Sequence, residues 1–107
     1  MELYEYVGNL HNHTPYSDGI LYHREMAQAA AQAGLDFLIS TDHNIWVTGT
    51  EGYYNFKDGR NILVLTGEEI HDLDRKPAGS HLLVYDANTE LRNLSKNPHN
   101  LIENVAE

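Results

Sequence analysis

The sequence predicts an α/β fold in which most strands are parallel, and three observations lead to this prediction. A helix-forming segment, 21–33, lies between two short strand-like segments, as in a β-α-β unit. The run 61–66 (Asn-Ile-Leu-Val-Leu-Thr) is almost continuously apolar, which is typical of a strand buried on both faces. Polar residues follow the predicted strands at their carboxyl ends, where parallel α/β folds place their active sites.

The first strand and the turn after it are predicted from their side-chain types. Segment 7–13 is predicted as the strand, with Val7, Leu10 and Tyr6 as apolar anchors. Segment 14–19 (Thr-Pro-Tyr-Ser-Asp-Gly) is predicted as a turn, because proline restricts φ and Asp-Gly tolerates positive φ.

A helix and a second strand follow. Segment 21–33 is rich in Ala, Gln, Glu, Arg and Met, which are good helix formers. Gly34 occupies the position of a left-handed C-terminal cap, and segment 35–41 is the second strand. At helical spacing, the apolar face of the helix is predicted to consist of Met26, Ala29 or Ala30, and Ala33.

Segment 44–60 contains three glycines and is predicted to hold a short helix over 51–56. The third strand covers 61–66, a polar loop covers 72–79, and a fourth strand covers 81–85.

A final helix is predicted to begin at Asn97-Pro98, an N-cap followed by proline at the first helical position. Its apolar residues are Leu101, Ile102 and Val105. The sequence stops about ten residues past the cap, and an isolated helix of that length is marginal in water. We therefore expect residues 1–107 to form a single domain that is incomplete at its C-terminus. A frayed C-terminal helix docked on the sheet is the alternative.

Composition excludes several functional classes. Seven basic and sixteen acidic residues give a net charge of −9, which disfavours nucleic-acid partners. The chain has no cysteine, so disulfides, thiolate zinc sites and cysteine nucleophiles are excluded. No apolar run approaches the roughly 18 residues of a membrane span, and the N-terminus lacks the features of a signal peptide. We expect no membrane association and a cytoplasmic location.

Imidazole and carboxylate side chains follow the predicted strands. His11 and His13 are two residues apart, so in a strand they point to the same side. Alone, such a pair is often no more than a polar strand end, but acidic and histidine residues also follow the later strands. This donor set without thiolates suits Zn²⁺, Mn²⁺ or Fe²⁺, and a carboxylate that bridges two cations allows a multinuclear site.

These residues belong to four short motifs that together resemble those of a known protein family. They are His-Asn-His-Thr-x-x-Ser-Asp-Gly at 11–19, Thr-Asp-His-Asn at 41–44, Gly-Glu-Glu at 67–69 and His-Leu-Leu at 81–83. In this order and spacing they resemble the PHP (polymerase and histidinol phosphatase) superfamily, and most closely its CehA/McbA-like branch of metallohydrolases. The resemblance implies the N-terminal part of a distorted (β/α)₇ barrel, with up to three divalent metal ions at the carboxyl ends of its strands.

The resemblance also implies a metal ligand at six positions. The first ion would bind His11 and His13, the second His81, and the third Asp18 and His43, while Glu69 would bridge the first two ions.

Two neighbouring acidic residues receive other interpretations. Glu69 is preferred to Glu68 because the family motif is Gly-x-Glu, and adjacent strand residues face opposite ways. Asp42 is predicted to orient a neighbouring imidazole, and His23 and His71 are predicted to be exposed or at the rim.

The later motifs of the family, a His-Pro-type or cysteine ligand and an Asp-x-His pair, do not occur in this sequence. His99 follows a proline instead of preceding it, and is not assigned. The chain therefore offers six of the nine ligands that the resemblance implies, and each implied metal site lacks one. A fragment of a longer protein explains this best, and a shortened, inactive homologue is the rival.

The resemblance implies a metal-dependent phosphoesterase that hydrolyses a small phosphorylated substrate with a metal-activated water. A non-catalytic metal-binding or regulatory module is the alternative, and a nucleic-acid phosphodiesterase or exonuclease fits the acidic charge less well. We expect the 107-residue chain to be weakly active or inactive, and its open strand edges to favour homo-oligomers.

Overall fold

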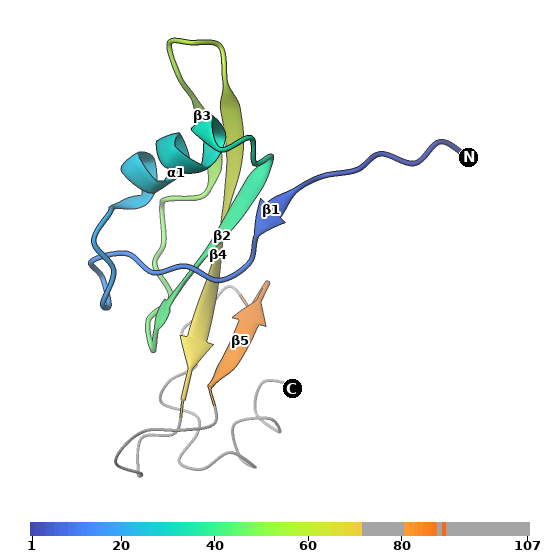
Figure 1. The fold of residues 1–107 in the computed structure, drawn as a ribbon. Coiled ribbons are helices and arrows are strands. Elements are labelled where there is room, and N and C mark those ends of the chain that lie inside the picture. Colours follow the sequence, from blue (N-terminus) through green and yellow to red (C-terminus); the bar gives the residue numbers. More distant parts are fainter. Residues whose placement is uncertain (72–80, 88, 90–107) are drawn as a thin grey trace.

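The computed structural model describes residues 1–71, 81–87 and 89. These residues form a mixed α/β fold with one helix and one five-stranded sheet (Figure 1). The predicted loop 72–79 and the predicted helix from Asn97 lie outside the described residues. In chain order the elements are β1 (Gly8–Asn9), α1 (His23–Gln32), β2 (Phe37–His43), β3 (Gly52–Asn55), β4 (Asn61–Ile70) and β5 (Leu82–Tyr85).

The sheet brings the carboxyl ends of β2 and β4 side by side. Its order is β1-β2-β4-β3, and β5 also pairs with β4. Strands β1, β2 and β4 are parallel, whereas β3 and β5 run antiparallel to β4. The prediction of mostly parallel strands is confirmed for three of the five, and the complete barrel stays a prediction. The register pairs Phe37 with Leu63 and, at the far end, His43 with Glu69.

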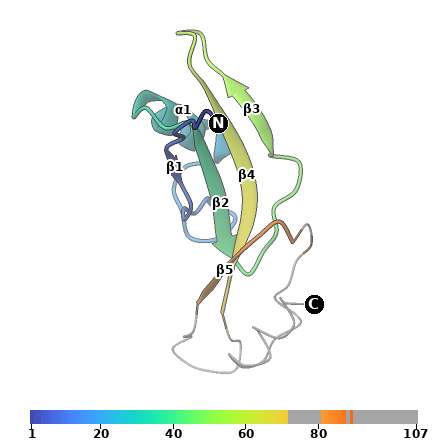
Figure 2. The ribbon, with the colours of Figure 1, turned by 90° about the vertical axis from the view of Figure 1, so that its right-hand side faces the viewer.

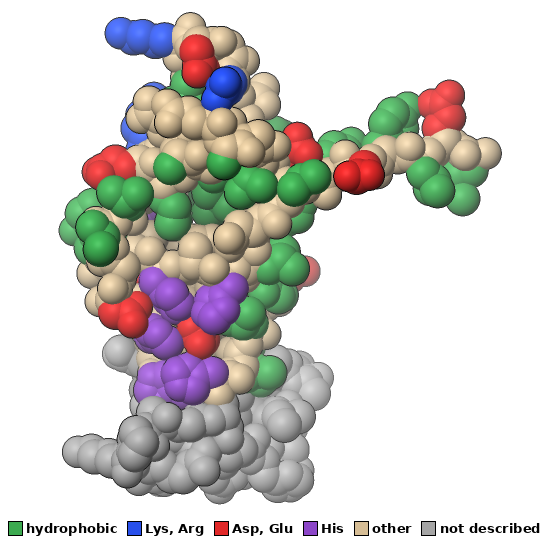
Figure 3. Space-filling model, viewed as in Figure 1, with side chains coloured by type: hydrophobic (Ala, Val, Ile, Leu, Met, Phe, Trp, Pro, Cys, Tyr) green, Lys and Arg blue, Asp and Glu red, His purple; other side chains and the backbone are tan. Residues whose placement is uncertain are grey.

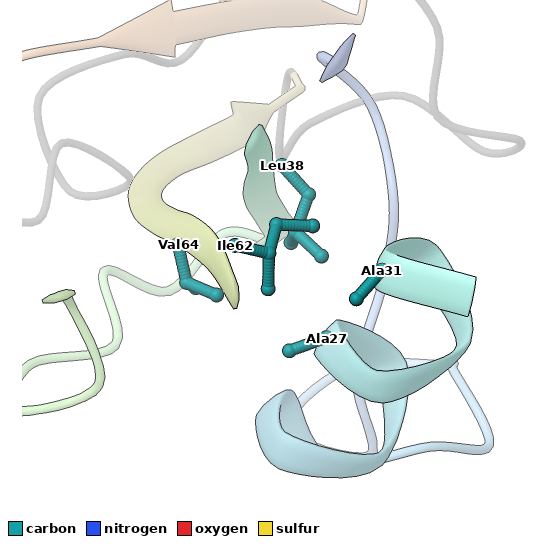
Figure 4. Packing of buried hydrophobic residues seen from close by; sticks show 5 residues of the cluster. All are labelled: Ala27, Ala31, Leu38, Ile62 and Val64. Atoms are coloured by element: carbon teal, nitrogen blue, oxygen red, sulfur yellow. The ribbon is translucent and has the colours of Figure 1, made fainter. Parts of the chain in front are cut away.

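Helix α1 covers one face of the sheet (Figure 2). Ala27 and Ala31 pack against Leu38, Ile62 and Val64, and all five side chains are buried (Figure 4). The small alanine side chains let the helix backbone approach the strands closely. The opposite face carries half-buried apolar residues of β2 and β4, and no described helix lies on it.

The predicted apolar face of the helix is partly wrong. Ala29 and Ala33 are exposed, and the buried residues of α1 are His23, Ala27 and Ala31. Alanines occur at so many positions of this segment that helical spacing fits several faces equally well. Which alanines of α1 are buried therefore depends on how the helix packs on the sheet and not on the helix sequence alone.

The predicted cap at Gly34 is confirmed. Its φ is +89°, a conformation that glycine adopts without steric cost. The N–H of Gly34 donates to the carbonyl of Ala31 at 3.1 Å, and that of Leu35 donates to Ala30 at 3.0 Å. These two bonds form a Schellman motif, and Leu35 packs against the core beside the helix.

The first strand is shorter than predicted, and its expected anchors are not buried. Only Gly8 and Asn9 form β1, while Tyr6, Val7 and Leu10 are exposed. The N-terminal arm leads away from the sheet (Figure 1). Beyond β1, the amide of Asn12 donates to the Ile39 carbonyl at 2.8 Å. This side-chain bond keeps the chain beside β2 after the regular ladder ends.

The helix predicted over 51–56 is wrong, because this segment contains β3. Tyr53 and Tyr54 favour a strand over a helix. Strand β3 pairs antiparallel with β4, and a turn at Asp58 and Gly59 connects the two strands. Gly59 has a φ of +87° in this turn. The third predicted strand is also longer than expected. Because β4 continues to Ile70, Glu68 and Glu69 are strand residues.

Candidate metal centre

The structure brings all six predicted ligand residues together at the carboxyl ends of the parallel strands. Histidine side chains gather there around acidic groups (Figure 3). Their donor atoms form three groups, and within each group all donor atoms lie within 4.8 Å of one another. The groups are His11, His13 and Glu69; His13, Asp18 and His43; and His43, Glu69 and His81.

The tightest group is a triangle of donors. The Nε2 atoms of His11 and His13 lie 3.1 Å apart. Glu69 Oε2 lies 2.8 Å from the first and 3.0 Å from the second. His11 and His13 follow β1 and are not strand residues, yet both imidazoles point at the same carboxylate oxygen, as predicted for this pair.

Glu69 uses its second oxygen in another group. Oε1 lies 2.8 Å from His81 Nδ1, on the other side of the carboxylate. The Glu69 side chain is only 6% exposed, because it lies between β2 and β5. Each oxygen of this buried carboxylate thus faces a different set of imidazoles, and Glu68 belongs to none of the groups formed by the described residues.

Asp18 joins the centre from the turn at 15–18, which confirms the predicted turn chemistry. Its carboxylate lies 3.5 Å from His43 Nε2 and 3.7 Å from His13 Nδ1. The rings of His13 and His43 are stacked, with centroids 4.4 Å apart. Asp18 is the most exposed member of the centre, so this side is open to solvent.

Asp42 holds that turn in place, which corrects the prediction that it orients an imidazole. Its buried carboxylate accepts bonds from the Thr14 N–H and hydroxyl, both at 2.7 Å, and from the Ser17 hydroxyl at 2.6 Å. Thr14 follows His13, and Ser17 precedes Asp18. The carboxylate therefore fixes the segment that carries two of the six candidate ligands.

The local electrostatics favour the protonation states that metal ligands need. Burial raises the pKa of the Glu69 carboxyl, but hydrogen bonds from His11 and His81 and the nearby imidazole charges outweigh it and hold the pKa below its usual value. Burial lowers the pKa of His43, although Glu69 and Asp18 oppose the shift. An ionised carboxylate and a neutral imidazole are the forms that coordinate metal.

Comparison with protein families matches the PHP domain to residues 9–106 of the 107. The chain belongs to the PHP family. PHP domains are in general metal-dependent phosphoesterases or other hydrolases, and they typically bind divalent metals. No curated protein and no solved structure matches the chain.

The donor geometry fits the divalent metals of PHP domains. Two ligand atoms about 2.0–2.1 Å from one ion lie about 3.0 Å apart at an octahedral angle and about 3.4 Å apart at a tetrahedral one. The triangle at Glu69 has sides of 2.8, 3.0 and 3.1 Å. The buried Nδ1 atoms of His13 and His43 have no hydrogen-bond partner among the described residues. This centre can therefore hold a divalent ion.

The three groups cannot all be filled by these six side chains alone. His13 and His43 each belong to two groups, and a neutral imidazole offers one nitrogen lone pair. Only a carboxylate such as Glu69 bridges two ions readily. A complete PHP centre with several ions would need further ligands from water or protein.

Of the two histidines predicted to be exposed or at the rim, one is buried and the other lies at the rim of the centre. His23 is only 4% exposed, so its predicted exposure is wrong. His71 lies partly buried beside the centre, with its ring centroid 5.1 Å from that of His81 and 5.8 Å from that of His43. Its position two residues after Glu69 was the available sequence signal.

Among the described residues, no helix is long and apolar enough to cross a membrane.

Proposed function

We propose that this PHP domain is a metal-dependent phosphoesterase of the CehA/McbA-like branch, acting on a small phosphorylated substrate. The observation that carries the proposal is the Glu69 carboxylate, whose oxygens face His11 and His13 on one side and His81 on the other. A carboxylate in this position would be suited to holding two cations at once, as carboxylates do in two-metal hydrolytic sites.

The proposed roles of the side chains follow from their positions. His11, His13 and Glu69 would hold one divalent ion, Glu69 and His81 a second, and Asp18 and His43 a third. When bound, Zn²⁺, Mn²⁺ or Fe²⁺ supplies a hydroxide nucleophile near neutral pH and offsets the charge of the phosphoryl group. The ionised Glu69 stays between the imidazoles, and Asp42 keeps the Asp18 turn aligned.

The charge of the chain agrees with this assignment. A net charge of −9 repels a phosphorylated substrate unless bound cations reverse the local field. Asp18 and His11 are the more exposed ligands, so substrate and water can approach from their side.

We also propose that residues 1–107 are one incomplete domain that supplies six of the nine family ligands.

The experiment measures hydrolysis of p-nitrophenyl phosphate by the full chain after metal removal and reconstitution with Zn²⁺ or Mn²⁺. We expect slow, metal-dependent hydrolysis that Glu69→Gln abolishes. Glu51→Gln makes the same change at an exposed position and should leave the rate unchanged.

Three results would contradict the proposal in different ways. Equal rates for wild type and Glu69→Gln would remove Glu69 from the centre. Metal binding without any metal-dependent hydrolysis would mean that residues 1–107 on their own are a non-catalytic metal-binding module. Failure to bind metal would remove both functions.

A further inference from the structure

Asn44 links the ends of the two central strands beside the proposed metal centre. Its N–H donates to the Glu69 carbonyl at 3.0 Å, and its side chain contacts the backbone and the ring of His71. Its φ is +53°, in the left-handed region that asparagine tolerates better than most residues. Such a conformation is maintained only where the surrounding contacts require it, and it often marks a functional site.

The hydrogen bonds of Asn44 determine which ring nitrogen of His71 carries the proton. The backbone N–H of His71 donates to Asn44 Oδ1 at 3.2 Å, and this bond fixes the orientation of the Asn44 side-chain amide. The amide nitrogen Nδ2 therefore faces His71 Nε2, 2.6 Å away. Because an amide nitrogen only donates, Nε2 must accept. The neutral ring consequently carries its proton on Nδ1, and its Nε2 lone pair is occupied and unable to bind a metal.

The fixed ring of His71 lies against candidate ligands of two different metal groups. Its centroid is 5.1 Å from that of His81, with the rings inclined by 32°. It is 5.8 Å from the ring of His43, in an edge-to-face arrangement at 64°. The rings of His43 and His81 are themselves 5.5 Å apart, so the three imidazoles form one packed cluster.

We propose that Asn44 and His71 are a positioning pair: Asn44 locks the His71 ring in one tautomer and orientation, and that ring aligns His43 and His81. Neither residue of the pair binds a metal. Instead, the pair sets the relative orientation of ligands in two neighbouring metal groups. This inference rests on the proposed metal centre, because alignment of His43 and His81 matters only if they coordinate ions.

The lock is tested first in metal-free protein, where it does not depend on the proposed function. Long-range ¹H–¹⁵N correlation spectra of the full chain at mildly alkaline pH distinguish the two tautomers of each histidine. We expect His71 to be protonated at Nδ1 in the wild type. Asn44→Asp replaces the amide donor with an acceptor, so the proton should move to Nε2. Asn55→Asp makes the same chemical change at an exposed position of strand β3 and should leave the tautomer unchanged.

The positioning role is tested with Co²⁺ as the probe. Asn44→Gly accepts the positive φ but loses both side-chain bonds. We expect its Co²⁺ affinity to fall about tenfold, the lower end of the loss found when residues that orient metal ligands are changed, and the ligand-field absorption of bound Co²⁺ to change. A purely structural role for Asn44 would alter the melting temperature and leave this spectrum as in the wild type.

Each result supports or overturns a defined part of the inference. A wild-type His71 protonated at Nε2 would overturn the lock. Wild-type affinity and absorption in Asn44→Gly would overturn the positioning role while leaving the metal centre intact. Wild-type protein that binds no Co²⁺ would overturn the proposed metal centre, and the positioning role with it, whereas the tautomer measurement would still judge the lock.

Discussion

At the scale of single residues, Asp42 has the clearest structural effect. Its side chain is buried, and three hydrogen bonds of 2.6–2.7 Å from Thr14 and Ser17 compensate its charge. Each net hydrogen bond to a charged group contributes about 1.5–3 kcal/mol to stability. The same bonds fix the turn that carries Asp18, so the stability of the fold and the position of a candidate metal ligand depend on one carboxylate.

We therefore predict that Asp42→Ala lowers the free energy of unfolding by about 3 kcal/mol or more and also weakens metal binding. Urea titration and metal analysis of dialysed protein measure the two effects. Asp58→Ala removes an exposed carboxylate from the β3–β4 turn and serves as the control. Unchanged metal content in a folded Asp42→Ala variant would show that the turn does not depend on this residue.

His23 gives a prediction about pH. Burial lowers the pKa of His23 below its ordinary value of 6.5, with an opposing effect from Asp42. The folded state therefore favours the neutral ring, and the unfolded state binds the proton more readily. The stability contributed by the neutral ring is present above pH 6.5 and is lost as the pH falls towards the folded-state pKa.

The comparison of wild type with His23→Gln isolates this residue. We expect the unfolding free energy of metal-free wild type to fall more steeply between pH 7.5 and pH 5 than that of the variant. The difference between the two proteins at each pH removes contributions from the other histidines. Parallel curves would assign the pH dependence to those other groups.

At the scale of elements, the turn at 14–19 depends on Gly19. A Cβ atom at this position would overlap the backbone carbonyl of His13. The N–H of Gly19 also donates to the Thr14 carbonyl at 2.9 Å, which closes the turn. Any larger residue must displace backbone that carries the candidate ligands His13 and Asp18.

Gly19→Ala should accordingly reduce the metal content of dialysed protein. Gly49→Ala is the control, since Gly49 has a φ of +81° and nothing within 4 Å of an added Cβ. Both changes strain the backbone and should lower stability, but only Gly19→Ala should release metal. Equal metal content in the two variants would separate the turn from the centre.

The strands that carry the candidate site were largely predictable, and those around it were not. Strands β2 and β4 are central and apolar, so their burial pattern is visible in the sequence. Strand β1 has two residues at the sheet edge, and its pairing depends on partner contacts that a sequence pattern does not contain. Segment 51–56 is predicted as a helix although its tyrosines and the Asp58-Gly59 turn favour a hairpin, and the structure has β3 there.

The meeting of His43 and Glu69 was predictable because the carboxyl ends of neighbouring parallel strands share one edge of the sheet, whereas the full set of six candidate ligands came from the resemblance to the PHP motifs. The PHP motifs further assigned them to separate ions, and those assignments stay predictions. The sequence does not predict the contacts of Asp42, Asn44 and His71. Their contacts join residues 25–28 positions apart, and such contacts appear only once the strands are paired.

At the scale of the whole molecule, charge and metal binding are coupled. The net charge of −9 leaves the chain under self-repulsion, and the candidate ligands place several carboxylates and imidazoles within a few ångströms. Divalent ions at this centre would reduce the repulsion and link β1, β2, β4 and the segment before β5.

The predicted homo-oligomer is a separate question, which sedimentation of the metal-free and metal-bound chain would answer.

Metal binding should therefore stabilise the fold. A ligand that binds only the folded state, at a free concentration 100 times its Kd, adds about 2.7 kcal/mol, which raises Tm by roughly 10 °C or more in a domain of this size. We predict such a rise on adding Zn²⁺ or Mn²⁺ to metal-free wild type, reversed by a chelator. The His11→Ala, His13→Ala double variant should show little of it, because the donor triangle at Glu69 loses two of its three atoms. An equal rise in both proteins would mean that the ions stabilise the chain at another place, and the assignment of the first metal to His11, His13 and Glu69 would be wrong.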